Sequence, residues 1–375
     1  MKNVLVTGSA GFIGRNLVEA LKRKKEVAVL ASDVDTAPAE VERFLAKADV
    51  IYHLAGVNRP QNPAEYEIGN AGATRDLITR LNALRRIPLV VFSSSTQAAL
   101  NNPYGLSKLG AEQALEIWAS RTGAAVALFR LPNVFGKWCR PNYNSAVATF
   151  CHNITRGLSV NISDRTYELE IVYVDDVVQA FIDLLDLSHK AGAKFHDVSP
   201  TFNVTLGEIV DLLTSFKSSR KDLVMPDFSR PLVKRLYATY LSYMPEDGFG
   251  YALDMKEDHR GALAELFKAT TFGQIFVSRT KPGATRGNHY HDTKTEKFCV
   301  LEGDAVFRFR HIEGEELITY RISGRDFRVM DIPPGYTHSI ENVGDTDMVV
   351  LFWASEPFDP QKPDTHPLEV IHEKA

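Results

Sequence analysis

The first half of the chain alternates short apolar runs with longer amphipathic runs, and this alternation limits the possible folds more than any other feature. The apolar runs lie at 3–8, 27–32, 49–56, 88–95 and 124–136, with helical periodicity between them. Parallel strands need long crossover connections, usually helices, which then cover both faces of the sheet. Strands buried on both faces read as nearly continuous apolar runs. We therefore predict a doubly wound parallel α/β unit of the Rossmann type.

The pattern changes near residue 250. Alternating or apolar runs lie at 274–280, 297–312, 316–322, 327–335 and 348–356, separated by Gly, Pro, Asp and Asn. Short strands at this spacing favour a small antiparallel sandwich or barrel. Helical patterning nearly ends with "GALAELFK" at 261–268. Two amphipathic helices, expected at 204–220 and 230–244, should close the first unit, so we expect domains 1–245 and 246–375.

Composition narrows the classes of function. The 375 residues allow two or three domains. A net charge of -4, without any block of like charges, argues against nucleic acid as a partner. Three cysteines without motif spacing indicate free thiols in a reducing compartment. No apolar run approaches the ~20 residues that span a bilayer, and the chain enters a strand at once. We expect a cytoplasmic protein without membrane insertion.

The segment "TGSAGFIG" carries Gly8, Gly11 and Gly14 between the first predicted strand and helix. In this context the first glycine allows a tight turn, the second admits a pyrophosphate, and the third lets helix and strand pack closely. The intervening Phe12 and Ile13 belong to the same predicted cofactor-binding segment. The amino end of the helix would face the phosphates of a dinucleotide.

The end of the second strand should select between NAD and NADP. An acidic side chain there binds the ribose 2′-hydroxyl of NAD, and its absence leaves room for a 2′-phosphate. We expect the strand to end at Ala31, and Asp33 lies slightly beyond it. Asp33 is a candidate cofactor residue, and both cofactors stay open.

The segment "PYGLSK" places Tyr104 and Lys108 four residues apart at the start of a helix, hence on one face. An ammonium group near a phenol lowers the phenol's pKa toward working pH. Such a tyrosine can exchange a proton with a carbinol oxygen while hydride moves at the same carbon. A serine of "FSSST", at the end of the preceding strand, can hold the same oxygen.

These motifs, with "HLAG" (53–56), "RLPNVFG" (130–136) and "VYVDDVV" (172–178), resemble the extended short-chain dehydrogenase/reductase family of nucleotide-sugar epimerases, dehydratases and reductases. The resemblance covers about residues 1–240. It implies that Ser95 is catalytic, with Ser94 as the alternative. It also implies that Leu54, Ala55 and Gly56 line the cofactor and that Asn133 touches cofactor or substrate. The chain departs from the family because only eight residues separate Ser95 from Tyr104.

A second cluster lies in "GNHYHDTKTE". His289 and His291, two apart on a predicted strand, point to one face. Glu296 and His338 should converge with them from neighbouring strands. Three imidazoles and a carboxylate suit Zn, Fe, Mn or Ni.

The spacings G-x5-H-x-H-x4-E-x6-G (283–303) and P-x-G-x2-H-x3-N (333–342) resemble the two motifs of the cupin superfamily, over roughly 250–370. A cupin without metal is the alternative. The stretch "RGNH" (286–289) resembles the segment that supplies the base of sugar-nucleotide epimerases in the dTDP-rhamnose pathway. His289 is thus either a ligand or a catalytic base.

A reductase unit and an epimerase-like unit share one logical substrate, a 4-keto nucleotide sugar, since the ketone acidifies the C3 proton. The stretches 53–60, 135–150, 204–213 and 341–348 closely resemble bifunctional enzymes of capsule and O-antigen biosynthesis. That resemblance implies C3 epimerisation and NADPH-dependent C4 reduction of a UDP-4-keto-2-acetamido-2,6-dideoxyhexose, giving UDP-2-acetamido-2,6-dideoxy-L-talose on the route to UDP-N-acetyl-L-fucosamine. It also implies zinc and a homodimer.

Two further residues and two rival functions complete the expectations. Lys137 and Arg140 are candidate partners for the UDP phosphates. In one rival, the second unit is a non-catalytic module for dimerisation or sensing. In the other, the chain is a 4,6-dehydratase or 4-epimerase that recycles bound NAD.

Overall fold

The computed structural model describes residues 1–371 of the chain. The chain forms two compact units. The first comprises Met1–Thr214 and Arg235–Pro245, and the second comprises Ser215–Lys234 and the chain from Glu246 onward. The helices α8 (Leu206–Asp222) and α9 (Pro231–Ser242) each contribute residues to both units, whereas we expected both helices to close the first unit alone.

A six-stranded parallel sheet forms the centre of the first unit. Its strand order is β2-β1-β3-β4-β5-β8. The strands are β1 (Lys2–Thr7), β2 (Val27–Ser32), β3 (Val50–His53), β4 (Leu89–Ser95), β5 (Ala125–Leu131) and β8 (Gly192–His196). The chain reverses its direction of winding between β1 and β3, and ligands of such sheets bind beyond the carboxyl ends of the strands at that point.

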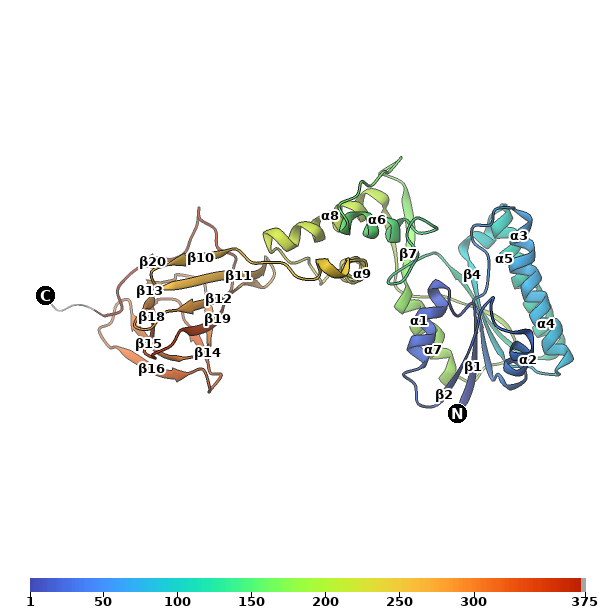
Figure 1. Ribbon diagram of the computed structural model, residues 1–375, viewed down its shortest axis with the longest axis horizontal. Coiled ribbons are helices and arrows are strands. Elements are labelled where there is room, and N and C mark those ends of the chain that lie inside the picture. Colours follow the sequence, from blue (N-terminus) through green and yellow to red (C-terminus); the bar gives the residue numbers. More distant parts are fainter. Residues whose placement is uncertain (372–375) are drawn as a thin grey trace. The chain divides into compact units, whose positions relative to one another are not determined.

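Helices cover both faces of this sheet (Figure 1). The helices α1 (Phe12–Leu21) and α7 (Val174–Asp183) pack on one face, and α2 (Pro38–Lys47), α4 (Ala73–Ala83) and α5 (Pro103–Thr122) pack on the other. Alternate strand residues divide between the two layers: Val4 and Val6 pack under α1 and α7, whereas Leu5 packs under α2, α4 and α5. The inner strands β1, β3, β4 and β5 are therefore buried on both sides, as their apolar sequences require, whereas the edge strands β2 and β8 are only partly buried.

A smaller sheet, β6-β7-β9, lies beside the main one. It consists of β6 (Asn133–Phe135), β7 (Glu168–Tyr173) and β9 (Thr201–Thr205), and α6 (Ala146–Thr155) belongs to the same region. The expected strand 124–136 is in fact two strands in different sheets, interrupted at Pro132, which has no amide hydrogen for a ladder. The short helices are α3 (Ala64–Tyr66), the π-helix η1 (Glu67–Gly72), η2 (Thr96–Ala99) and η3 (Leu184–Asp186).

The second unit contains two antiparallel sheets, β10-β11-β12-β19-β14-β17 and β16-β15-β18-β13-β20. Side chains of both sheets, among them Val300, Phe307, Ile340 and Val350, form one apolar core. The fold class predicted from the sequence, a parallel α/β sheet followed by an all-β unit, is confirmed. The elements are η4 (Glu246–Gly248), β10 (Met255–Asp258), β11 (Gly261–Ala269), β12 (Gly273–Thr280), β13 (Thr285–Tyr290), β14 (Glu296–Glu302), β15 (Asp304–His311), β16 (Ile318–Ser323), β17 (Val329–Ile332), β18 (Tyr336–Asn342), β19 (Met348–Ala354) and β20 (His366–Pro367).

The helical interpretation of 261–268 is wrong, because this segment is strand β11. It pairs with β10 on one side and with β12 on the other, and a bulge between Glu265 and Phe267 interrupts its register. Two ladders of backbone hydrogen bonds thus outweigh the modest helix preference of Ala, Leu, Glu and Lys.

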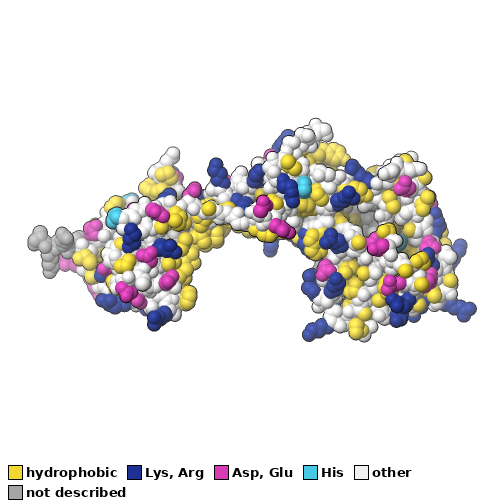
Figure 2. Space-filling model, in the orientation of Figure 1, with side chains coloured by type: hydrophobic (Ala, Val, Ile, Leu, Met, Phe, Trp, Pro, Cys, Tyr) yellow, Lys and Arg dark blue, Asp and Glu magenta, His cyan; other side chains and the backbone are white. Residues whose placement is uncertain are grey.

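Charged side chains of both signs are interspersed over the visible faces of both units (Figure 2). None of the helices within residues 1–371 combines the length and apolar character needed to cross a membrane.

Candidate functional site

The glycine loop between β1 and α1 has no room for a side chain at Gly8 or Gly14. Gly8 has a φ of +67°, and a Cβ on Gly14 would lie 2.1 Å from the Gly8 carbonyl oxygen. The Gly11 amide donates to that same oxygen at 3.0 Å. Gly11 is the N-cap of α1, whose first turn contains Phe12 and Ile13 and has no side-chain cap and no acidic residue. The first amides of α1 are thus available to an anion, as a pyrophosphate site requires.

Asp33 braces this loop. The strand β2 ends at Ser32, one residue later than expected, so Asp33 follows it directly. One carboxylate oxygen of Asp33 accepts from the Ala10 amide at 2.7 Å, and the other accepts from the Val34 amide at 2.9 Å. The side chain therefore lies at the cofactor loop, and its role toward the ribose stays a prediction.

The segment 53–56 lies beside the glycine loop at the ends of β1 and β3. The Leu54 amide donates to the Thr7 carbonyl at 3.3 Å, and the Ala55 amide lies 3.3 Å from the Thr7 hydroxyl. A Cβ on Gly56 would lie 2.7 Å from the Asn70 side-chain oxygen and 3.3 Å from the Lys108 ammonium. Because Gly56 has no side chain, the Lys108 ammonium can lie close to the loop that follows β3.

His53 is a buried connector of three elements. Its ring nitrogens lie 2.9 Å from the Thr7 hydroxyl on β1 and 3.1 Å from the Thr74 hydroxyl on α4. Burial, together with the nearby Lys108 ammonium, lowers the pKa of His53 to about 3. The imidazole is therefore neutral at pH 7.

The structure separates the two candidate serines. Ser94 donates to the buried carboxylate of Glu112 at 2.5 Å. Ser95 accepts from the Gln97 amide at 3.2 Å and hydrogen-bonds the Tyr104 hydroxyl. Successive side chains of a strand point to opposite sides, and only Ser95 lies on the side of the tyrosine. Geometry thus favours Ser95 as the residue that shares an oxygen with Tyr104.

Tyr104 and Lys108 lie on one face of α5, as their spacing predicts. The ammonium is 6.0 Å from the centroid of the Tyr104 ring and donates to the Ser93 carbonyl at 3.0 Å. Burial raises the pKa of Tyr104, although the Ser95 hydrogen bond opposes this. Burial also lowers the pKa of Lys108 to about 8, while the Glu112 carboxylate opposes this. The expected lowering of the tyrosine pKa is wrong for the chain alone, because burial outweighs the effect of the Ser95 hydrogen bond.

The candidate substrate residues have partners of their own. Lys137 pairs with both carboxylate oxygens of Asp175, at 2.5 and 2.7 Å. The Arg140 guanidinium lies over the Tyr143 ring, 5.3 Å from its centroid. Asn133 donates to the Glu170 carbonyl at 3.3 Å. Their roles toward a substrate stay predictions. A phosphate group bound by Lys137 would compete with the Asp175 carboxylate for the ammonium.

Sequence reasoning did not identify three residues of this region, Asn70, Glu112 and Tyr66. Asn70 donates to Ser107 at 2.9 Å and accepts from the Val57 amide at 2.8 Å, which fixes the loop after Gly56. Glu112 binds Arg130 through two contacts, at 3.0 and 2.6 Å. The Tyr66 ring lies 5.6 Å from the Tyr104 ring. Asn70 lies in the π-helix η1, a feature frequent at functional sites that sequence periodicity does not reveal.

The second cluster of residues forms inside the second unit. His289 on β13 and His338 on β18 are direct partners across the sheet, Glu296 begins β14, and His291 directly follows β13. One metal-competent atom from each of the four residues lies within 4.8 Å of the others. Glu296 Oε2 is 3.2 Å from His291 Nε2 and 3.6 Å from His338 Nε2. The structure thus brings together all four predicted ligands.

The donor atoms fit a metal ion. Glu296 Oε2, His291 Nε2 and His338 Nε2 are buried without a hydrogen-bond partner among the described residues. Donors about 2.1 Å from a tetrahedral zinc would be about 3.4 Å apart, close to the distances found here. Burial lowers the pKa of His289 to about 4. Burial alone would raise the pKa of Glu296, but the adjacent His291 and His338 imidazoles lower it instead.

A cavity of about 400 Å³ lies in the second unit, and its lining includes none of the four cluster residues. Phe309, which lines it, is the direct cross-strand partner of His338, and their ring centroids are 6.5 Å apart. Tyr320 and Tyr336 also line the cavity, and the Arg328 guanidinium is 5.3 Å from the centroid of the Tyr320 ring.

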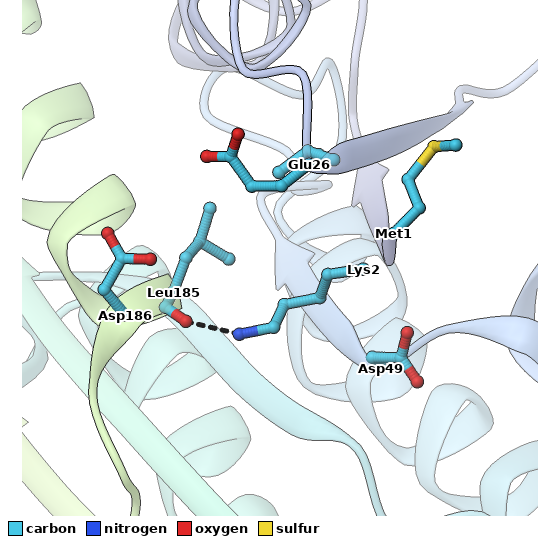
Figure 3. Close-up of a pocket in the computed structure, with 7 residues that line it drawn as sticks. Met1, Lys2, Glu26, Asp49, Leu185 and Asp186 are labelled. Atoms are coloured by element: carbon cyan, nitrogen blue, oxygen red, sulfur yellow. Dashed lines mark hydrogen bonds between the residues drawn. The ribbon is translucent and has the colours of Figure 1, made fainter.

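Another cavity, of about 580 Å³, is unrelated to either cluster. Figure 3 shows Lys2, Glu26, Asp49 and Asp186 around it, with the Lys2 ammonium donating to the Leu185 carbonyl. These residues lie where β1, β2 and β3 begin, whereas the glycine loop follows the other end of β1. Ligands of parallel sheets bind at that other end.

Comparisons with known proteins agree with this geometry. Residues 4–198 match the NAD dependent epimerase/dehydratase family, and residues 256–366 match the polysaccharide biosynthesis C-terminal domain. The chain is 42% identical over 367 residues to the UDP-2-acetamido-2,6-beta-L-arabino-hexul-4-ose reductase of Pseudomonas aeruginosa, covering 98% of each chain.

Solved structures give the same result. The capsular polysaccharide assembling protein CapF from Staphylococcus aureus is 45% identical, with a TM-score of 0.90 over 98% of this chain and 100% of CapF. A UDP-glucuronic acid 4-epimerase from Bacillus cereus in complex with NAD is 17% identical, with a TM-score of 0.55 over 64% of this chain and 96% of the epimerase, and shares the fold. The chain therefore belongs to the NAD dependent epimerase/dehydratase family, as an enzyme of the nucleotide-sugar oxidoreductase and epimerase class that carries a polysaccharide biosynthesis C-terminal domain.

Proposed function

We propose that this protein epimerises C3 of a UDP-4-keto-2-acetamido-2,6-dideoxyhexose in its second unit and then reduces the C4 ketone in its first unit with NADPH. The product would be UDP-2-acetamido-2,6-dideoxy-L-talose, on the route to UDP-N-acetyl-L-fucosamine. The observation that carries the proposal is the presence of two complete clusters, Ser95–Tyr104–Lys108 and the four metal-competent residues, in a relative of a UDP-hexulose reductase.

The first cluster suits the reductive direction. NADPH, when bound, would supply a hydride to C4. The hydroxyls of Ser95 and Tyr104 would hold the ketone oxygen, and Tyr104 would donate its proton as that oxygen gains charge. Burial keeps Tyr104 protonated at neutral pH, which a proton donor requires. The Lys108 ammonium, close to both Gly56 and Tyr104, would orient the cofactor and then stabilise the phenolate.

The second cluster suits enolisation. The C4 ketone acidifies the C3 hydrogen, and a base that removes this proton and returns it on the other face inverts C3. A zinc ion held by His289, His291, Glu296 and His338 would polarise a neighbouring oxygen. His289 is either a ligand or the base. Phe309, whose ring lies 6.5 Å from that of His338, also lines a cavity of about 400 Å³ in which part of the substrate would lie.

Two further proposals concern assembly and location. We propose a homodimer in the cytoplasm. Half-buried apolar side chains lie in register on one face of the sheet, with Ile275 opposite Trp353 and Val277 opposite Leu351. This face is opposite to the one that carries the buried Val350, so a second copy could cover it.

The test is NMR of the products formed from the UDP-4-keto sugar and NADPH in D2O. We expect deuterium at C3 and stoichiometric oxidation of NADPH. The Tyr104→Phe variant should still incorporate deuterium but should lose most NADPH oxidation. A His338→Ala variant should lose deuterium incorporation yet reduce a ketone supplied with the inverted C3. A product without ring deuterium would refute the epimerisation step.

A second candidate function gives the C-terminal unit a structural or sensing role. Four protein donors form a closed set, which is typical of structural zinc, whereas catalytic zinc usually keeps an open position. In this case a His289→Ala variant would stay a folded dimer with full turnover on the first ketone. In the remaining alternative function, an epimerase that recycles NAD, the protein would purify with bound NAD and would show no net consumption of the cofactor.

A further inference from the structure

We propose that residues 363–370, here called the C-terminal strap, clamp the histidine cluster from outside, and that Asp364 is the positioning residue for His291. The inference rests on the metal centre proposed above. It concerns neither the four ligands nor the reaction, but the part of the chain that sets the geometry of one ligand.

The contact to His291 sets the orientation of its ring. The Nδ1 atom of His291 is 2.5 Å from the backbone carbonyl oxygen of Asp364. A carbonyl only accepts, so Nδ1 must carry the proton and Nε2 must carry the lone pair. That Nε2 atom is the one that lies 3.2 Å from Glu296. Asp364 thus selects the tautomer of His291 that can bind a metal ion at the cluster.

The Asp364 side chain holds its own carbonyl in place. Its carboxylate accepts from the amides of Asp292, Thr293 and Lys294, at 2.9, 3.0 and 2.8 Å. The Thr293 hydroxyl adds a fourth hydrogen bond at 2.9 Å. These donors belong to the turn that directly follows His291. A single side chain therefore joins the strap to the loop between the ligands His291 and Glu296.

The hydrogen bonds of the Asp364 carboxylate argue against a second role for it, as a metal ligand at the surface. Asp292, Asp364 and His366 form a second group of possible ligand atoms near the surface. The Asp364 oxygens already accept four hydrogen bonds from the turn, so the carboxylate serves as an anchor of the backbone rather than as a ligand.

The rest of the strap is attached to the strands that carry ligands. In β20, His366 and Pro367 pair with Tyr290 and His289 of β13. The Leu368 amide donates to the Asn288 carbonyl at 2.9 Å. The Leu368 carbonyl accepts from Thr337, the neighbour of His338, at 2.5 Å.

The end of the strap is fixed as well. The buried Arg310 on β15 donates to the carbonyl oxygens of Glu369 and Val370, at 2.8 and 3.0 Å. The strap is thereby tied to three adjacent strands, β13, β18 and β15. Outer partners of this kind typically change metal affinity by about 10- to 100-fold when they are removed.

The experiment measures binding of Zn²⁺ to the metal-free full-length protein by competition with a chelator. The Asp364→Ala variant should bind Zn²⁺ about 10- to 100-fold more weakly. The Glu369→Ala variant is the matched control, because it removes the same charge from the same strap at an exposed side chain whose backbone alone is used. Its affinity should stay within about twofold of that of the unaltered chain, far inside the effect expected of an outer partner.

A second pair of variants separates anchoring from backbone strain and from misfolding. Asp364 has a φ of +32°, which glycine adopts freely, so Asp364→Gly removes the carboxylate without adding strain. We expect the glycine variant to lose affinity like the alanine variant, and Asp364→Asn, which keeps one accepting oxygen, to lose less. The spectrum of bound Co²⁺ should change in the alanine and glycine variants, which a loss of general stability would not cause.

The outcomes separate this inference from the proposed function. If the unaltered chain binds Zn²⁺ and all Asp364 variants bind it equally well, the strap does not position His291. If the unaltered chain binds no Zn²⁺, the proposed metal centre is wrong and the strap inference falls with it. If Zn²⁺ binding depends on Asp364 while no deuterium enters C3, the strap inference stands and the proposed epimerisation does not.

Discussion

At the scale of single residues, the partners of a buried polar group decide what it can do. Ser94 and Ser95 are adjacent in sequence and equally polar, yet their environments differ. Ser94 is bound to Glu112, which in turn holds Arg130. Ser95 shares a hydrogen bond with Tyr104. The first serine belongs to the core of the unit and the second to the site where a substrate oxygen would lie.

This difference predicts opposite effects for the two alanine variants. Ser95→Ala should lower kcat for NADPH oxidation by about 100-fold, because a donor to the reacting oxygen is lost, with little change in stability. Ser94→Ala should lower the free energy of unfolding by about 1–3 kcal/mol, because a buried hydrogen bond to a carboxylate is lost. Steady-state kinetics and urea unfolding measure the two effects. A reversed pattern would assign the catalytic role to Ser94.

At the scale of elements, one histidine joins β3 to its neighbours. His53 ends β3 and contacts Thr7 on β1 and Thr74 on α4. Burial and the nearby Lys108 ammonium penalise the charged form of the ring, which is therefore neutral at pH 7. The carboxyl ends of β1 and β3, where the cofactor loops begin, therefore depend on the protonation state of this residue.

The pKa of His53 predicts sensitivity to acid. The unfolded chain takes up a proton near pH 6.5, whereas the folded chain does so only near pH 3. Between these values the unfolded state binds more protons, so stability is lost as the pH falls, by up to about 1.4 kcal/mol per pH unit. Urea unfolding from pH 7 to pH 4 should show this slope, and His53→Gln should flatten it. His311→Gln, at an exposed position of the second unit, is the control and should leave the slope unchanged.

At the scale of the whole molecule, the chain contains separate hydrophobic cores in its two units. Two cores flank the parallel sheet, and a third fills the space between the antiparallel sheets. The proposed ligands are divided in the same way, with the dinucleotide in the first unit and the metal in the second. Each ligand should therefore stabilise the unit that binds it.

Calorimetry tests this division. NADPH at about 100 times its Kd should raise the free energy of unfolding of the first unit by about 2.7 kcal/mol. The free energy of unfolding of the second unit should not change. Chelation of the metal should lower the unfolding temperature of the second unit and leave that of the first unit unchanged. His338→Ala should remove the effect of the chelator but not the effect of NADPH. A single transition that responds equally to both ligands would contradict independent units.

Much of this arrangement follows from local sequence alone. The alternation of apolar and amphipathic runs predicted the parallel sheet, because the periodicity of a strand or helix is a property of neighbouring residues. The glycine spacing located the loop after β1, and the spacing of His289 and His291 placed both side chains at one cluster. Each of these signals lies within a few residues of the chain.

Tertiary structure decided which partner each polar side chain meets. It made 261–268 a strand through pairing with β10 and β12, and it tied Asp33 to the glycine loop and Lys137 to Asp175. It also brought Asp364 to His291 across 73 positions of sequence. Periodicity records which face of an element is buried, but not which distant group lies against that face. The tautomer of His291 and the choice between two neighbouring serines therefore depend on contacts that form only in the folded chain.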